Sequence, residues 1–178
     1  MTRSLALIAA LYGFAAGQLA GQGTDALIQN ALRAAPPAVA QAATVVDGKH
    51  NVLRRGSNAW TCMPDDPAVP GDAPMCLDAP WFELIAALTS KRAPRIERVG
   101  VGYMLQGDFP VSNVDPYAPG PTPDNQWVAD GPPHVMLVFP DAKALEGLST
   151  DPNNGGPWVM WKGTAYAHLM IPTAPRRP

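Results

Sequence analysis

The chain has 178 residues, of which 47% are hydrophobic and 16% are charged, and its formal net charge at pH 7 is −2. This length and hydrophobicity suit one domain with a proper core. The basic residues are scattered apart from short pairs such as Arg54-Arg55 and Arg176-Arg177. The chain therefore lacks the basic surface that phosphate neutralisation requires, which argues against nucleic acid as a partner.

The N-terminus has the pattern of a secretory signal peptide. Arg3 precedes an apolar run from Leu5 to Ala16, and Gly17 completes a small-residue cleavage site. A run of about 12 residues is too short to span about 30 Å of hydrocarbon but suits a signal core. We expect residues 1–17 to be removed and residues 18–178 to form one exported domain without a membrane span, periplasmic or secreted. A short buried helix is the alternative interpretation.

Short elements are predicted next. Residues 24–35 carry their apolar side chains on one helical stripe, which Pro36 and Pro37 end, so we expect an amphipathic helix. Residues 43–63 alternate β-branched or aromatic residues with turn signals, which predicts two or three short antiparallel strands.

The two cysteines, Cys62 and Cys76, enclose a loop with four prolines and one glycine. An even number of cysteines in an oxidising compartment implies a disulfide. Redox or metal chemistry is the weaker interpretation, because C-x-x-C spacing is absent. Closing such a loop contributes about 3 kcal/mol in the chain-entropy model, and less where prolines already restrict the unfolded chain.

The strongest helical pattern covers residues 78–92. Asp78 is a suitable N-cap, Pro80 lies in the first turn, and apolar residues recur at i, i+3, i+4 and i+7 from Trp81. Lys91 and Arg92 suit the negative end of the helix dipole, and the following proline ends the helix.

Residues 98–105 are predicted to form a strand with glycines at positions 100 and 102 on the same face as Met104. The glycines leave a flat patch on which either a neighbouring aromatic ring or a ligand can pack. No nucleotide site is predicted, because the sequence matches neither G-x-G-x-x-G nor a P-loop.

Residues 107–133 contain seven prolines and hardly any periodic pattern. Loops of this length inside a domain are usually functional or disordered. Phe109, Tyr117 and Trp127 favour an ordered flap, because disordered linkers are poor in aromatic residues.

The last third contains a strand at 134–139, a short helix after Asp141, and strands at 158–161 and 165–171. We predict an α+β fold with a mainly antiparallel sheet, two or three helices and long proline-rich loops. A tight turn at Lys162-Gly163 would set Val159 opposite Tyr166 and Trp161 opposite Thr164.

Two His-x-Met pairs stand out, His134 with Met136 and His168 with Met170. Alternate residues of a strand share a face, so each histidine projects with its methionine. Thioether sulfur selects Cu(I) and imidazole binds copper in either redox state, so neighbouring strands could supply a copper site. The alternative is ordinary packing, because methionine fills cores and histidine among apolar residues is often structural.

Catalytic motifs such as G-x-S-x-G and H-E-x-x-H are absent from the sequence. Acid–base chemistry would need His134 or His168 to meet a carboxylate such as Asp108, Asp115 or Asp151. A hydrolase-like enzyme therefore stays as an alternative that depends on the fold.

Five stretches resemble a group of uncharacterised exported bacterial proteins: GSNAWTCMPDDP, APMCLDAPW, RVGVGYMLQGD, SNVDPYAP and DPNNGGPWVMWKGTAYAHLMIP. The similarity extends over most of the mature chain, which supports a single domain, and it implies no activity or catalytic residue. The leading interpretation is an exported, soluble α+β protein with a non-enzymatic role in binding a small ligand or a metal ion. A periplasmic copper-binding protein and a hydrolase-like enzyme are the alternatives.

Overall fold

The computed structural model describes residues 13–175, and for residues 13–22 it describes the backbone alone. Within this part the α-helices are α1 (Gly13–Leu32), α2 (Pro37–Ala40) and α3 (Ala79–Thr89), and a 3-10 helix η1 spans Ala142–Leu145. The strands are β1 (Thr44–Val46), β2 (Val52–Arg54), β3 (Thr61–Met63), β4 (Met75–Leu77), β5 (Gly100–Met104), β6 (Val111–Ser112), β7 (Trp127–Val128), β8 (His134–Val138), β9 (Trp158–Met160) and β10 (His168–Pro172).

One sheet organises the described residues, in the order β2-β1-β3-β4-β5-β8-β10-β9. The sheet is mixed, because β1 and β3 run parallel while its other neighbours pair antiparallel. The mixture of helices and sheet fits the predicted α+β class. The prediction of antiparallel strands throughout residues 43–63 is wrong at β3, because a crossover through β2 and the loop after it returns the chain to the starting end of β1.

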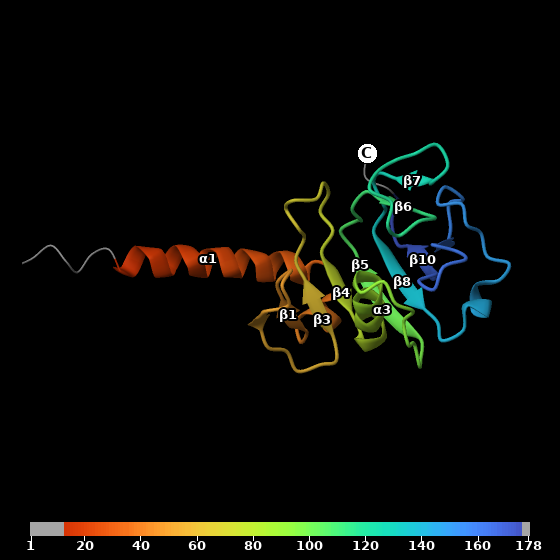
Figure 1. The fold of residues 1–178 in the computed structure, drawn as a ribbon. Coiled ribbons are helices and arrows are strands. Elements are labelled where there is room, and N and C mark those ends of the chain that lie inside the picture. Colours follow the sequence, from red (N-terminus) through yellow and green to blue (C-terminus); the bar gives the residue numbers. More distant parts are fainter. Residues whose placement is uncertain (1–12, 176–178) are drawn as a thin grey trace, which may run out of the picture.

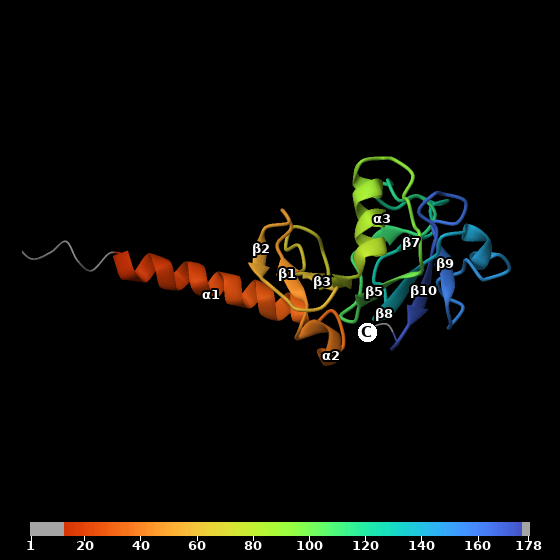
Figure 2. The ribbon, with the colours of Figure 1, turned by 90° about the horizontal axis from the view of Figure 1, so that it is seen from below.

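The end of α1 and helix α3 pack on opposite faces of the sheet (Figures 1 and 2). On one face, Ala31 of α1 joins a buried cluster with Val45, Cys62 and Cys76. On the other face, α3 inserts Trp81 into the main core. The predicted helix over residues 24–35 is confirmed as the end of the longer α1, which extends away from the sheet in both views.

The disulfide between Cys62 and Cys76 is confirmed, and the two residues lie opposite each other in β3 and β4. The predicted signal peptide lies mostly outside the described residues, and its predicted cleavage point falls within α1. In residues 13–175 no helix combines the length and hydrophobicity of a membrane span.

Helix α3 covers the glycine face of β5. Of the two predicted alternatives, a neighbouring aromatic ring or a ligand, the structure has the aromatic ring. A methyl group at Gly102 would come within 2.9 Å of Leu77 and Met136 and 3.4 Å of the Trp81 ring. The helix is fixed there because Asp78 accepts a hydrogen bond from the Trp81 backbone N–H at 3.2 Å. The capped helix and the flat strand face therefore bring the Trp81 indole into the core.

Part of the 107–133 segment folds into a small ribbon, in which β6 pairs with β7. Phe109 and Val111 pack against the main core. The buried side chain of Asn113 donates to the Thr150 carbonyl at 2.8 Å and accepts from Trp158 Nε1 at 3.1 Å. These anchors agree with the prediction of an ordered flap.

The predicted register of the last hairpin is wrong. His168 lies opposite Met160 and Met170 opposite Trp158, so the predicted opposition of Val159 and Tyr166 is shifted along the strand. Trp161 takes a left-handed backbone conformation (φ 55°), and its N–H donates to the Asn113 carbonyl at 2.8 Å. The strand therefore ends at Met160, and residues 161–167 form a longer connection than a tight turn.

Candidate functional site: a methionine-lined cavity

The two His-x-Met pairs lie on adjacent strands and on one face of the sheet. Met136 of β8 is directly opposite Met170 of β10, and His134 is opposite Pro172. All four histidine and methionine side chains of the two pairs are buried. Strand alternation puts each histidine on the same face as its methionine, and the pairing of β8 with β10 brings the two methionines together.

The Cα atoms of the two histidines lie on opposite sides of this methionine pair along the strands. Each is two residues from the methionine of its own strand, and the strands are antiparallel. At about 3.4 Å per residue, their Cα positions differ by about 14 Å along the strand direction. His134 and His168 therefore approach the methionines from opposite ends.

A small apolar cavity of about 50 Å³ lies between the sheet and α3. His168, Met136 and Met170 line this cavity, whereas His134 is not among its lining residues. Trp81, Trp161 and Asp108 also line it. Five methionines contribute to the wall: Met75, Met104, Met136, Met160 and Met170.

Both histidines are held by the same local hydrogen bond. Nδ1 of His134 lies 2.7 Å from the Pro132 carbonyl oxygen, and Nδ1 of His168 lies 2.9 Å from the Tyr166 carbonyl oxygen. A carbonyl only accepts, so in each ring Nδ1 carries the proton and donates it. In the neutral ring Nε2 then keeps its lone pair, which is the arrangement found in metal-binding histidines.

Burial keeps His168 neutral. Desolvation lowers the pKa of His168 to about 4, opposed by its hydrogen bond to Tyr166 and reinforced by the nearby His134. The rings of Trp81 and Trp161 each meet the imidazole edge-on, with centroids 5.0 Å away. At neutral pH the ring is therefore a neutral donor fixed between two indoles.

Asp108 is the nearest carboxylate to His134. Its Oδ2 lies 3.9 Å from His134 Nε2, which is beyond hydrogen-bond distance. Desolvation raises the pKa of Asp108, while His134 and the Phe109 backbone N–H oppose this shift. The pair lies in the interior, with 6% of the Asp108 side chain and none of the His134 side chain exposed.

Two buried polar atoms in the described part of the chain have no hydrogen-bond partner, Trp81 Nε1 and His134 Nε2. Such atoms are rare in folded proteins, and each calls for an explanation such as a bound water or ion. Trp81 lines the cavity and His134 adjoins Asp108, which also lines it. One unpaired atom therefore belongs to a residue of the cavity wall, and the other lies beside Asp108 of that wall.

The other carboxylates considered from the sequence lie elsewhere. Asp115 accepts from the Tyr117 N–H and Asp151 from the Asn153 N–H, each at the exposed surface. Among residues 13–175, no group of three or more His, Cys, Asp and Glu side chains is placed to hold a metal ion. The donors at the cavity are mainly thioethers.

Sequence reasoning missed three of the cavity methionines, Met75, Met104 and Met160. The strand pattern placed Met104 on the glycine face of β5, but nothing local linked that face to β8. The high methionine content of the chain, seven residues in 178, was the one available signal.

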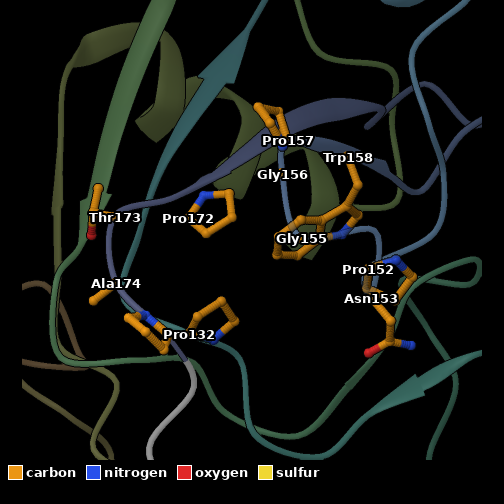
Figure 3. A pocket seen from close by; sticks show the side chains of 11 residues that line it. Pro132, Pro152, Asn153, Gly155, Gly156, Pro157, Trp158, Pro172, Thr173 and Ala174 are labelled. Atoms are coloured by element: carbon orange, nitrogen blue, oxygen red, sulfur yellow. The ribbon is translucent and has the colours of Figure 1, made fainter.

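A second space is an open hollow of about 750 Å³ at the ends of β9 and β10 (Figure 3). Proline rings, including Pro132, Pro157 and Pro172, and the Trp158 side chain surround it. None of its lining residues also lines the methionine cavity. Its wall is mainly proline, glycine and one indole, so it offers few side chains that could bind a metal ion or act as an acid or base.

No family model, curated protein or solved structure matches the chain. The resemblance to exported bacterial proteins remains a prediction.

Proposed function

We propose that the protein is an exported binding protein for Cu(I), which it holds in the methionine-lined cavity. The observation that carries this proposal is that five methionines and the neutral His168 line one small cavity of about 50 Å³. The proposed ligands are His168, Met136 and Met170, with a further thioether from the same wall.

The chemistry of these donors supports copper in its reduced state. Thioethers are soft ligands that favour Cu(I), whereas carboxylates and carbonyls suit harder ions such as Mg²⁺ and Ca²⁺. Imidazole binds copper in both redox states. The hydrogen bond from His168 to the Tyr166 carbonyl orients the ring and leaves Nε2 available.

The predicted compartment agrees with this choice of ion. The N-terminal sequence predicts export, and the disulfide between Cys62 and Cys76 is of the kind that persists in oxidising compartments. With both cysteines in that bond, thioethers are the soft sulfur ligands that the protein offers.

The decisive experiment is a competition for Cu(I) between the apoprotein and the chelator bicinchoninate without oxygen. We expect the wild-type protein to withdraw copper in proportion to its concentration. The Met136→Leu, Met170→Leu double variant should bind about tenfold more weakly or worse, since even changes around metal ligands alter affinity by this much. Equal withdrawal of copper by the two proteins would leave the proposal without support.

A matched control separates ligand loss from a change in packing. Met63 packs against the main core but does not line the cavity. Because leucine conserves the volume of methionine, each of these substitutions should keep the fold. The Met63→Leu variant should therefore bind copper like the wild-type protein.

The hydrolase-like alternative has weaker support. Its nearest candidate pair, His134 and Asp108, is separated by 3.9 Å, and the His134 side chain is fully buried. A general base must reach its partner through a hydrogen bond or one water. The geometry therefore favours binding over acid–base catalysis.

A further inference from the structure

A surface hollow of about 260 Å³ lies next to the methionine cavity. Segments 70–72, 106–108 and 129–131 form most of its wall. Asp108 lines both this hollow and the cavity, and it is the residue that their two linings share. Asp108 therefore lies between the hollow and the cavity.

Glycines bring the three segments together around Asp108. A Cβ at Gly131 would overlap Cβ of Asp108, and a Cβ at Gly71 would lie 3.2 Å from the Asp108 carbonyl oxygen. Gly107 and Gly71 have φ values of 125° and 120°, which disfavour other residues. Backbone therefore surrounds the carboxylate on the solvent side, and no long side chain from these glycine positions blocks it.

His134 lies beside Asp108 in the interior. Its Nε2 is buried, has no hydrogen-bond partner and lies 3.9 Å from Asp108 Oδ2. Across the sheet it is directly opposite Met104, which lines the cavity. Asp108 and His134 thus add a carboxylate oxygen and an imidazole nitrogen, both harder donors than thioether sulfur, beside the methionine cavity.

The mouth of the hollow also suits a cation. Asp72 and Asp130 line it together with Asp108, and Arg33 balances Asp72 through an ion pair of 2.8 Å. An excess of negative charge in a hollow raises the local concentration of cations. The unpaired His134 beside Asp108 is the independent feature that points to an ion moving further inward.

We propose that this hollow is the entrance for Cu(I) and that Asp108 and His134 pass the ion to the methionine cavity. This inference rests on the proposed function. The open proline-lined hollow (Figure 3) is not the entrance, because it shares no lining residue with the cavity.

The first test blocks the entrance after the protein has folded. Ala129 lines the entrance hollow and Ala174 the proline-lined hollow, and both are exposed. Since both native cysteines are in the disulfide, Ala129→Cys and Ala174→Cys each provide one thiol for a bulky maleimide. Loading with Ag(I), a soft monovalent probe, is followed by the emission of the tryptophans in the cavity wall.

Labelling at position 129 should slow Ag(I) loading by about tenfold or more, while labelling at position 174 should leave the rate unchanged. Equal rates before and after labelling at position 129 would overturn the entrance. An equal slowing at position 174 would do the same. If the unlabelled wild-type protein binds neither Ag(I) nor Cu(I), the proposed function itself fails, and that outcome is visible before any labelling.

A second variant tests Asp108 directly. The isosteric Asp108→Asn change should slow both loading and release by about tenfold while the dissociation constant stays within about threefold, because an entry route lowers the barrier in both directions. Asp130→Asn removes one charge at the mouth, so it should slow loading less than Asp108→Asn does and leave release unchanged, because it acts only on the approach of the ion. Similar rates in the wild-type protein and the Asp108→Asn variant would refute the transfer role.

Discussion

Mild acid should destabilise the folded protein because His168 is buried in its neutral form. Its pKa falls from 6.5 to about 4 on folding, chiefly through desolvation. Between these two values the unfolded chain binds a proton that the folded protein does not bind. The stabilising contribution is therefore fully present above pH 6.5 and is lost as the pH falls towards 4.

The size of the pKa shift of His168 determines how much stability is lost in acid. Linkage predicts that the free energy of unfolding falls by about 2 kcal/mol between pH 7.5 and pH 5, and by about 3 kcal/mol by pH 4. This is a large fraction of the 5 to 15 kcal/mol that is typical for a domain. Asp108 acts in the opposite sense, because its raised pKa favours the folded state in acid and this advantage is lost as pH rises through the folded pKa.

A variant isolates the contribution of His168 from that of Asp108 and other groups. His168→Phe keeps an aromatic ring between Trp81 and Trp161 but cannot titrate. Urea unfolding followed by tryptophan emission measures both proteins at several pH values. The stability of the wild-type protein relative to the variant should fall by about 2 kcal/mol between pH 7.5 and pH 5.

The control is His50→Gln, which removes an exposed imidazole and keeps the buried ring of His168, so this variant should still lose stability in mild acid. If the stability difference between the wild-type protein and the His168→Phe variant does not change with pH, the reasoning about burial of His168 is refuted.

Three further predictions concern the fold and its processing. Alkylation should add mass to the cysteines only after reduction, and reduction should lower the free energy of unfolding by about 2 to 3 kcal/mol, seen as an earlier urea midpoint. Gly56→Ala should destabilise by about 3 kcal/mol or more, because the new Cβ would overlap the backbone of Ala43, whereas Gly120→Ala meets nothing within 4 Å; equal urea midpoints would contradict this. Exported protein should begin near Gln18 by intact mass, and retention of Met1 would count against the signal peptide.

Local patterns determined several features of this protein from the sequence alone. The capping residue, proline and apolar spacing of α3 depend only on residues within a few turns, so Asp78 and Trp81 took their predicted roles. Export and an even cysteine count predicted the disulfide. Strand alternation correctly placed His134 with Met136 and His168 with Met170 on one buried face.

Only the tertiary structure decided which faces meet and in what register. The β9–β10 pairing depends on the bond from Trp161 to Asn113, a residue far away in the sequence, so a local turn rule gave the wrong partners. The cavity likewise draws its wall from α3 and several strands. Asp108 reaches His134 only because the loops at 70–72 and 129–131 close around it. Such contacts follow from long-range packing, which a period of two or 3.6 residues does not encode.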